Sequence, residues 1–182
     1  MPAAKKTPAM PYTGNSDPSD GPRLGTIKFA EIMASRWKFT NLGIWANRPM
    51  RGSNPPRLSV HASGRAVDLG YTAANAALVG KVCLWLADNH VALGIEEIHD
   101  YSGVSKKGSE MWGRGFRCNR NGAPGWKEWT ETDNGGTPGM GKMASKWIHI
   151  ELAPAPHGFA DDPKLLVKAW KAISETAPAA LA

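Results

Sequence analysis

Strict alternation of apolar and polar positions marks two segments of the chain, residues 66–71 and 147–152. A period of two is that of a strand with one buried face. In the first segment a polar position is Asp68, and in the second it is His149. The sequence therefore predicts two half-buried strands that present Asp68 and His149 on the face away from the core.

Apolar positions three and four residues apart predict helices in three further segments. These are residues 26–37, 73–89 and 163–173, whose expected N-caps are Thr26, Thr72 and Asp162. Pro163 supports the last of them, because proline is favoured at the first helical position. Gly94 is the expected end of the second helical region, since glycine readily adopts the left-handed conformation that ends helices.

Two more segments, residues 41–47 and 95–101, are also expected to be strands. Residues 48–57 hold three Pro and three Arg and are predicted to form a loop. Residues 103–141 are rich in glycine and are predicted to form a loop-rich insertion. Helices placed around a small, mostly antiparallel sheet correspond to an α+β domain.

The length of the chain, 182 residues, suits one compact domain. Residues 1–22 consist mainly of Pro, Ala, Lys, Ser, Asp and Gly, so we expect a flexible N-terminal arm with little to bury. The folded domain is expected over residues 23–176, followed by a frayed C-terminus, residues 177–182. We also predict that the first twenty or so residues are dispensable for folding.

The composition argues against several classes of protein. Apolar residues make up 42% of the chain and charged residues 21%, which suits a folded core and not a disordered chain. No apolar run approaches the roughly 18 residues of a membrane helix, and residues 1–20 lack a secretory signal, so we expect neither membrane insertion nor export. The net charge of +6 suits an anionic partner, but Lys and Arg form no dense block, which argues against nucleic acid.

Residues 59–68 carry the most informative pattern in the chain. His61 precedes a turn, and Asp68 lies on the polar face of the strand that follows. A neutral imidazole and a carboxylate are two of the three protein ligands that a catalytic zinc site uses. His149 can supply the third, because it occupies the polar face of its own strand as Asp68 does. Trp147, on the same face as His149, is expected to lie near the metal.

The pattern Ser-x-His-x-x-Gly-x-Ala-x-Asp, from Ser59 to Asp68, resembles the signature of the zinc D,D-carboxypeptidases and phage endolysin L-alanyl-D-glutamate endopeptidases. This family shares its fold with the hedgehog signalling domain. The sequence Trp-Ile-His-Ile-Glu over residues 147–151 matches the family's second motif at the histidine. The resemblance extends from about Asn41 to Pro154, with strands, loop, helix and insertion in the family's order.

The resemblance implies roles for six residues. One zinc ion would be held by three side chains, those of His61, Asp68 and His149. Ser59 would shape the loop or bind substrate. An arginine after the first strand, either Arg48 or Arg51, would hold a carboxylate of the substrate; the alternative is that both are solvated loop charges.

One position departs from the family's pattern. Lys146 stands three residues before His149, where the family has its general base, and a protonated lysine cannot accept the proton of water. Glu151, on the face of His149, is our first choice for the base, but the same side chain can instead orient the imidazole. The other candidates are Glu97 or His99 on the neighbouring strand and Glu131 or Asp133 in the long insertion. A third interpretation is that the metal-binding fold is kept and hydrolysis is lost.

These observations predict a zinc peptidase that cleaves the stem peptides of bacterial peptidoglycan. A cell-wall peptidase of this size without a signal peptide is typical of a bacteriophage. It would act as a lysin held in the host cytoplasm until release, or as a virion component with other virion proteins as partners. The alternative is an inactive wall-binding or structural tail module on the same fold. A basic nucleic-acid binder is supported only by the net charge and the tryptophan content.

Overall fold

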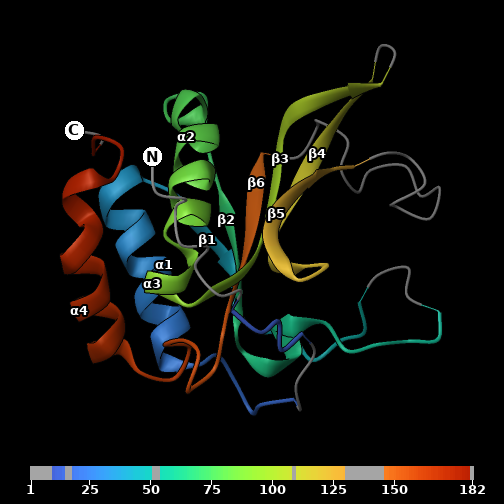
Figure 1. Ribbon diagram of the computed structural model, residues 1–182, viewed down its shortest axis with the longest axis vertical. Coiled ribbons are helices and arrows are strands. Elements are labelled where there is room, and N and C mark those ends of the chain that lie inside the picture. Colours follow the sequence, from blue (N-terminus) through green and yellow to red (C-terminus); the bar gives the residue numbers. More distant parts are fainter. Residues whose placement is uncertain (1–9, 15–17, 51–53, 108–109, 130–145, 181–182) are drawn as a thin grey trace, which may run out of the picture.

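The computed structural model describes residues 10–14, 18–50, 54–107, 110–129 and 146–180, and for residues 102–107 and 110–112 it describes the backbone alone. Within these residues four α-helices and six strands form an α+β fold (Figure 1). The helices are α1 (Leu24–Trp37), α2 (Ala76–Asp88), α3 (His90–Leu93) and α4 (Pro163–Ile173). The strands are β1 (Thr40–Gly43), β2 (Ala66–Gly70), β3 (Ile95–Lys107), β4 (Glu110–Arg120), β5 (Ala123–Glu128) and β6 (Trp147–Leu152). Two short 3₁₀ helices are η1 (Val60–Ser63) and η3 (Ser174–Thr176).

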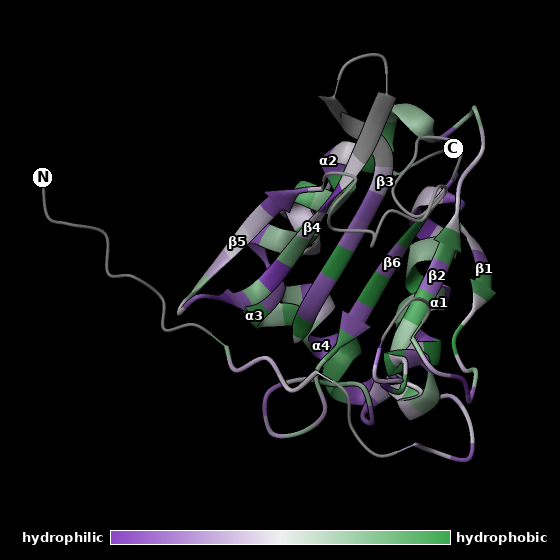
Figure 2. Ribbon diagram, turned by 90° about the vertical axis from the view of Figure 1, so that its right-hand side faces the viewer, coloured by the Kyte–Doolittle hydropathy of each residue, from purple (hydrophilic) through white to green (hydrophobic). Residues whose placement is uncertain are grey.

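The sheet is antiparallel throughout, in the order β1-β2-β6-β3-β4-β5, which confirms the expected α+β class. The four helices lie on one face of it, and Figure 2 looks onto the other face. The fully buried strand residues of the helical face include Val67, Leu69, Ile98, Ile148 and Ile150. Trp37, Trp85 and Trp170 join three helices by edge-to-face contacts. In the described part of the chain, no helix combines the length and apolar character needed to cross a membrane.

The register of the sheet places polar strand residues in two rows on the face away from the helices. Asp68, His149 and His99 are cross-strand neighbours on β2, β6 and β3. Two residues along these strands, Glu151 and Glu97 are paired in the same way. Directly paired residues point to the same face of a sheet. The polar alternation predicted for β2 and β6 thus becomes one continuous polar surface, because β6 pairs between β2 and β3.

The three predicted helices are confirmed in position, but the starts of α1 and α2 differ from the prediction. Asp162 caps α4 as predicted, since its side chain accepts two backbone N–H hydrogen bonds at 2.9 Å. Thr26 is a buried residue inside α1 and not its cap. Asn75, not Thr72, is the residue that precedes α2. Its side chain accepts the Thr72 N–H at 2.7 Å, and this hydrogen bond holds residues 72–75 in a turn. Gly94, with φ of 65°, ends the second helical region as predicted, although α3 follows α2 as a separate helix.

The predicted loop-rich insertion over residues 103–141 is wrong for its described part. β3 continues to Lys107, and β4 and β5 form a hairpin around Asn121 and Gly122, whose φ values are 55° and 89°. Asn-Gly is a strong hairpin signal, which the richness in glycine obscured. Glycine on β4 makes room for a ring: a Cβ on Gly115 would lie 2.8 Å from Trp129. Residues 130–141 of the prediction lie outside the described residues.

β1 ends at Gly43, so the strand predicted over residues 41–47 is too long. The chain then passes across η1, where the Ala46 N–H donates to the His61 carbonyl oxygen at 3.3 Å. This path places residues 44–47 next to a predicted metal ligand.

Residues 10–14, which we call the N-terminal strap, contradict the expectation of a flexible arm. Met10 is 5% exposed and belongs to the hydrophobic core. Thr13 donates from its backbone N and from Oγ1 to Glu96 Oε1, at 3.0 and 2.7 Å. The contacts come from single side chains without periodicity, so the sequence pattern does not reveal them.

The described part of the C-terminus is docked as well, which corrects the expectation of fraying over residues 177–182. Trp37 Nε1 donates to the carbonyl oxygen of Pro178 at 3.1 Å. Arg36 donates to carbonyl oxygens of the same segment, at 3.2 Å for that of Ser174. These bonds hold the segment that follows α4 against α1.

Candidate metal centre

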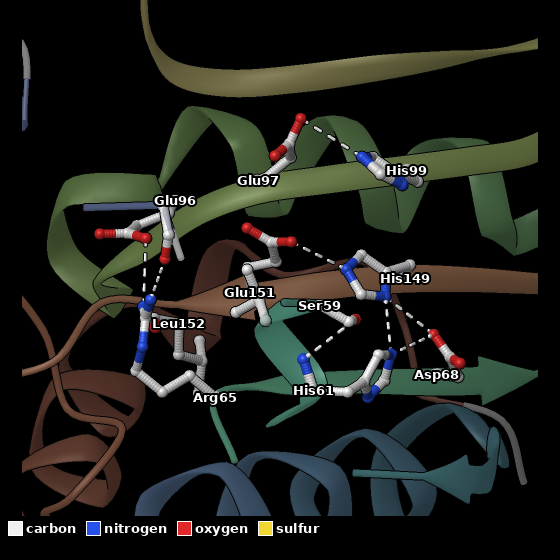
Figure 3. Close-up of polar contacts among 12 residues, drawn as sticks. Ser59, His61, Arg65, Asp68, Glu96, Glu97, His99, His149, Glu151 and Leu152 are labelled. Atoms are coloured by element: carbon white, nitrogen blue, oxygen red, sulfur yellow. Dashed lines mark hydrogen bonds and ion pairs between the residues drawn. The ribbon is translucent and has the colours of Figure 1, made fainter. Parts of the chain in front are cut away.

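His61, Asp68 and His149 converge on the open face of the sheet (Figure 3). Their ligand atoms all lie within 4.8 Å of one another. His149 Nδ1 lies 2.8 Å from Asp68 Oδ1 and 3.2 Å from His61 Nε2, and Asp68 Oδ1 lies 3.3 Å from His61 Nε2. The structure therefore brings the three predicted ligands together as a group that can hold a metal ion.

Sheet register and one tight turn position these side chains. Asp68 and His149 pair directly across β2 and β6. His61 lies in η1, where Ser59 at the N-cap accepts the His61 N–H with its Oγ at 3.3 Å. Gly64 ends η1 with φ of 70°, and an added Cβ there would collide with a backbone carbonyl oxygen. Ser59, Gly64 and Asp68 of the motif thus each have a structural reason.

In His61 and His149, the ring nitrogen that points away from Asp68 donates a hydrogen bond, which leaves the nitrogen nearest Asp68 as an acceptor. His61 Nδ1 donates to the Ile44 carbonyl oxygen at 2.8 Å, since a carbonyl can only accept. His149 Nε2 donates to Glu151 Oε1 at 3.1 Å. In neutral imidazoles, these partners assign lone pairs to His61 Nε2 and His149 Nδ1, beside the carboxylate of Asp68. Three acceptors this close repel one another unless a cation lies among them.

The electrostatics of the group favour a positive charge. Burial alone would lower the pKa of His149, but the hydrogen bonds and charges of Asp68 and Glu151 outweigh it and raise that pKa to about 10. Burial alone would raise the pKa of Asp68, but hydrogen bonds from His149 and His61 hold it well below its usual range. A proton bridges two of the three acceptors, whereas a metal ion contacts all three.

The size and chemistry of the group fit zinc. Zinc binds imidazole nitrogen and carboxylate oxygen at about 2.0–2.2 Å in a tetrahedron, which separates neighbouring ligand atoms by about 3.3–3.6 Å. The observed separations of 2.8, 3.2 and 3.3 Å are slightly shorter, so small side-chain movements suffice. Two nitrogens and one carboxylate also suit other borderline divalent cations, which zinc must outcompete by availability and geometry.

Glu151 contacts Nε2 of His149, the ring nitrogen that does not face His61 and Asp68. Its side chain is buried, with 4% of the residue exposed. Its second carboxylate oxygen, Oε2, lies 3.4 Å from the hydroxyl of Tyr12. A carboxylate in this place fixes the tautomer of a metal-binding imidazole and raises its basicity. This geometry corresponds to the second of the two roles considered for Glu151, that of orienting the ring.

Glu97 and His99 lie on the same face of β3, next to the ligand group. Arg117 Nη2 donates to both carboxylate oxygens of Glu97, at 2.9 and 3.1 Å. Burial alone would raise the pKa of Glu97, but His99 and Arg117 hold it well below its usual range, so it is a weak base. The ring centroids of His99 and His149 are 4.9 Å apart, and the His99 side chain is 26% exposed. Of these two candidates, His99 is the more accessible.

Glu131 and Asp133, the remaining candidates for a base, lie outside the described residues, as does Arg51. Arg48 is exposed, and its carbonyl oxygen accepts the Ser59 N–H at 3.1 Å, which places its backbone beside η1. Ser59 itself is buried and serves the turn that carries His61.

Aromatic rings continue the polar rows along β6 and β3. Trp147 lies on β6, two residues before His149, and its ring centroid is 4.3 Å from that of Tyr101. Trp129, which the sequence did not single out for the site, lies 4.9 Å from the ring of His99. Lys146, just before β6, is exposed.

Two buried charged residues were missed by sequence reasoning, Arg65 and Glu96, both 0% exposed. Arg65 Nη1 donates to Glu96 Oε2 at 3.1 Å and to the Leu152 carbonyl oxygen at 2.7 Å, and its Nη2 donates to the Gly14 carbonyl oxygen. These bonds join the residue before β2 to β3, β6 and the N-terminal strap at one end of the site. The available signal was the adjacent pair Glu96 and Glu97 between two isoleucines of the predicted strand, since a buried carboxylate requires a partner.

Comparison with known proteins finds no relative: no protein-family model, no curated protein and no solved structure matches the chain. Function is therefore inferred from the site and from the motif described above. The hedgehog-like fold stays a prediction, whereas the antiparallel α+β sheet and the His-Asp-His group are features of the structure.

Proposed function

We propose that the protein is a zinc-dependent peptidase that cleaves the stem peptides of bacterial peptidoglycan, on a fold of the hedgehog and D-Ala-D-Ala peptidase type. The observation that supports the proposal most directly is the group of three close acceptors on His61, Asp68 and His149. It is built from the residues that the zinc-peptidase motif contributes. Structural zinc sites are closed by four protein ligands, whereas catalytic sites keep three, and the described group has three.

Each residue of the site has a separate role in the proposed reaction. His61, Asp68 and His149 hold the ion, and Glu151 holds His149 through its Nε2–H. A zinc ion in such a site acts as a Lewis acid that polarises the scissile carbonyl and lowers the pKa of water. Arg48, exposed next to η1, is our candidate for holding a substrate carboxylate by charge-assisted hydrogen bonds.

Proton transfer falls to His99 in this proposal. Glu151 is committed to His149, and Glu97 is committed to Arg117. His99 is partly exposed beside His149, and its Nε2 lies 3.3 Å from Glu97 Oε1, which orients the ring. Its Nδ1 lies 3.3 Å from the hydroxyl of Tyr101, which has to rotate away before Nδ1 accepts a proton from water. A neutral imidazole can accept a proton from water and return it to the leaving amine.

We predict that His99→Ala keeps its zinc and loses about 10²–10⁴-fold in turnover, the usual worth of a general acid–base group. Glu97→Gln, which keeps the shape of the partner, should lose less. Steady-state cleavage of a synthetic stem peptide and elemental analysis of the same samples measure both effects. Wild-type turnover in His99→Ala would show that the base lies elsewhere.

The test of the proposed function is digestion of purified peptidoglycan by the zinc-loaded protein, followed by mass analysis of released fragments. We expect peptide fragments whose release stops when a chelator is added and resumes with zinc. His149→Ala should release none, while His157→Ala, which changes an exposed histidine, should match wild type. The fragment masses identify the bond that is cut.

The exposed Lys146 at the position of the family's base favours a second candidate, a wall-binding module that retains the metal site without hydrolysis. Cosedimentation with peptidoglycan separates the two. Binding without fragment release by the zinc-loaded protein would support the module, and release of muropeptides would exclude it.

We also propose that the protein acts during bacteriophage infection. A peptidase of this kind fits a bacteriophage lysin that waits in the host cytoplasm, or a virion part that opens the wall on entry. Peptidoglycan is the proposed partner in both settings. The net charge of +6 favours approach to an anionic cell wall.

A further inference from the structure

The N-terminal strap, residues 10–14, carries a residue that touches the carboxylates supporting the metal group. We propose that Tyr12 is a positioning residue of the metal centre, which acts by holding the carboxylate of Glu151 against His149. The proposal rests on the metal-binding part of the proposed function and does not depend on peptidase activity.

The strap is held in place on both sides of Tyr12. Met10 is buried in the hydrophobic core, and the Pro11 carbonyl oxygen lies 3.8 Å from Cys118 Sγ. Thr13 makes two hydrogen bonds to Glu96, and the Gly14 carbonyl oxygen accepts from Arg65. With these anchors, the tyrosine side chain has little freedom to leave the site.

The ring and the hydroxyl of Tyr12 have separate partners. The guanidinium of Arg117 lies over the ring, 4.2 Å from its centroid. The hydroxyl donates a bifurcated hydrogen bond, to Glu97 Oε2 at 3.0 Å and to Glu151 Oε2 at 3.4 Å. Burial, together with the charges of Glu151 and Glu97, raises the pKa of Tyr12 well above its usual value, so the hydroxyl keeps its proton.

Glu151 and Glu97 are cross-strand neighbours, so their two buried carboxylates face the same space. The Tyr12 hydroxyl is the donor between their Oε2 atoms. Without it the like charges repel, and each carboxylate can rotate about its own side-chain bonds. Rotation of Glu151 removes Oε1 from His149 Nε2, 3.1 Å away, and releases the tautomer that leaves Nδ1 free for the metal.

The effect on metal binding follows from this chain of contacts. Loss of an outer partner of a metal ligand typically costs 10–100-fold in affinity. Tyr12 contacts Glu151 and not the histidine, so it is one hydrogen bond further from the metal than Glu151 is. We therefore expect Tyr12→Phe to weaken zinc binding by about tenfold, the lower end of that range.

The test uses the full chain and a chromophoric chelator that competes for zinc. Tyr12→Phe keeps the ring beneath Arg117 and removes only the hydroxyl. Tyr71→Phe makes the same deletion outside the site and serves as the matched control. The expected result is an approximately tenfold larger zinc dissociation constant for Tyr12→Phe alone. In the zinc-bound protein, the Nε2 proton of His149 should also exchange faster with solvent, as seen by nitrogen-15 NMR of the imidazole, which a merely structural role would not change.

A double mutant identifies the route. If Tyr12 acts through Glu151, then Tyr12→Phe has no further effect on zinc affinity in a Glu151→Gln background. Equal zinc affinity of Tyr12→Phe and Tyr71→Phe would overturn the proposal, as would additive effects in the double mutant. A protein that binds zinc without releasing muropeptides would end the peptidase proposal and leave this one standing. A wild-type protein that binds no zinc would end both.

Discussion

At the residue scale, the site is a set of side chains that each need a specific partner. His61 and His149 show this most clearly, because one nitrogen of each ring is occupied by Ile44 or Glu151 and the other is left as an acceptor. The partners decide which atom is available to a metal. The identity of the three ligands alone does not.

We predict that His61→Ala and His149→Ala lose the bound metal, because two remaining ligands hold zinc weakly. Elemental analysis of purified protein should give one zinc per wild-type chain and much less in both variants. His157→Ala, at an exposed histidine, is the control and should keep full occupancy. Full occupancy in both ligand variants would refute the assignment.

His90 predicts a pH dependence of stability. Its Nδ1 donates to the Ala87 carbonyl oxygen at 2.7 Å, while its buried Nε2 has no partner among the described residues. Burial lowers the pKa of His90, with Ala87 and Asp88 opposing that shift to a smaller degree. The folded state thus holds this ring neutral, and the unfolded state takes up a proton below pH about 6.5.

This sign means that the contribution of His90 to stability is present above pH about 6.5 and is lost as pH falls toward the lowered folded-state pKa. The melting temperature of the wild type should therefore fall more steeply between pH 7.5 and 5 than that of His90→Phe. Parallel pH profiles for the two proteins would contradict the prediction.

At the scale of elements, the N-terminal strap and η1 supply residues of the metal centre that the sheet does not supply. The sheet supplies Asp68 and His149 by register, but His61 comes from η1, and the supporting Tyr12 comes from the strap. Both are short segments outside the sheet. The site is therefore sensitive to changes far from the ligands in sequence.

Removal of residues 1–14 should destabilise the protein, contrary to the expectation that about twenty N-terminal residues are dispensable. Burial of Met10 alone is worth about 1.5–3 kcal/mol. The loss of partners for buried Glu96 and Arg65 adds about 1–3 kcal/mol more. For a chain of this size the melting temperature should fall by about 5–24 °C. Removal of residues 1–9 is the matched control, and equal melting temperatures of the two truncated proteins would show that the strap contributes nothing.

At the scale of the whole molecule, the metal group joins parts of the chain that are distant in sequence. His61 and His149 are separated by 88 residues, and the helices that support the sheet lie on its opposite face (Figure 1). A ligand that binds the folded state alone stabilises the entire fold.

Zinc should therefore raise the melting temperature of the protein. At a free concentration 100 times the dissociation constant, the gain is about 2.7 kcal/mol. For a chain of this length it corresponds to about 5–11 °C. Differential scanning calorimetry with zinc and with chelator measures the shift, and His149→Ala should show none. A wild-type protein whose melting temperature ignores zinc would contradict the metal assignment.

The sequence by itself determined the parts that depend on local patterns. Period-two alternation located β2 and β6 to within one residue, and Asp162 with Pro163 located the start of α4. The face of each strand followed from the same alternation, because successive strand side chains point in opposite directions. That is why Asp68 and His149 could be predicted to share a polar surface before their strands were known to pair.

Only the tertiary structure decided which partners meet across the chain. The burial of Arg65 with Glu96 and the docking of Tyr12 between two carboxylates depend on contacts between segments 31 to 139 residues apart. Such contacts carry no periodic signal, because each is made by a single side chain. The hairpin of β4 and β5 was missed for a related reason: glycines that make room for Trp129 look like loop residues until the ring they accommodate is in place.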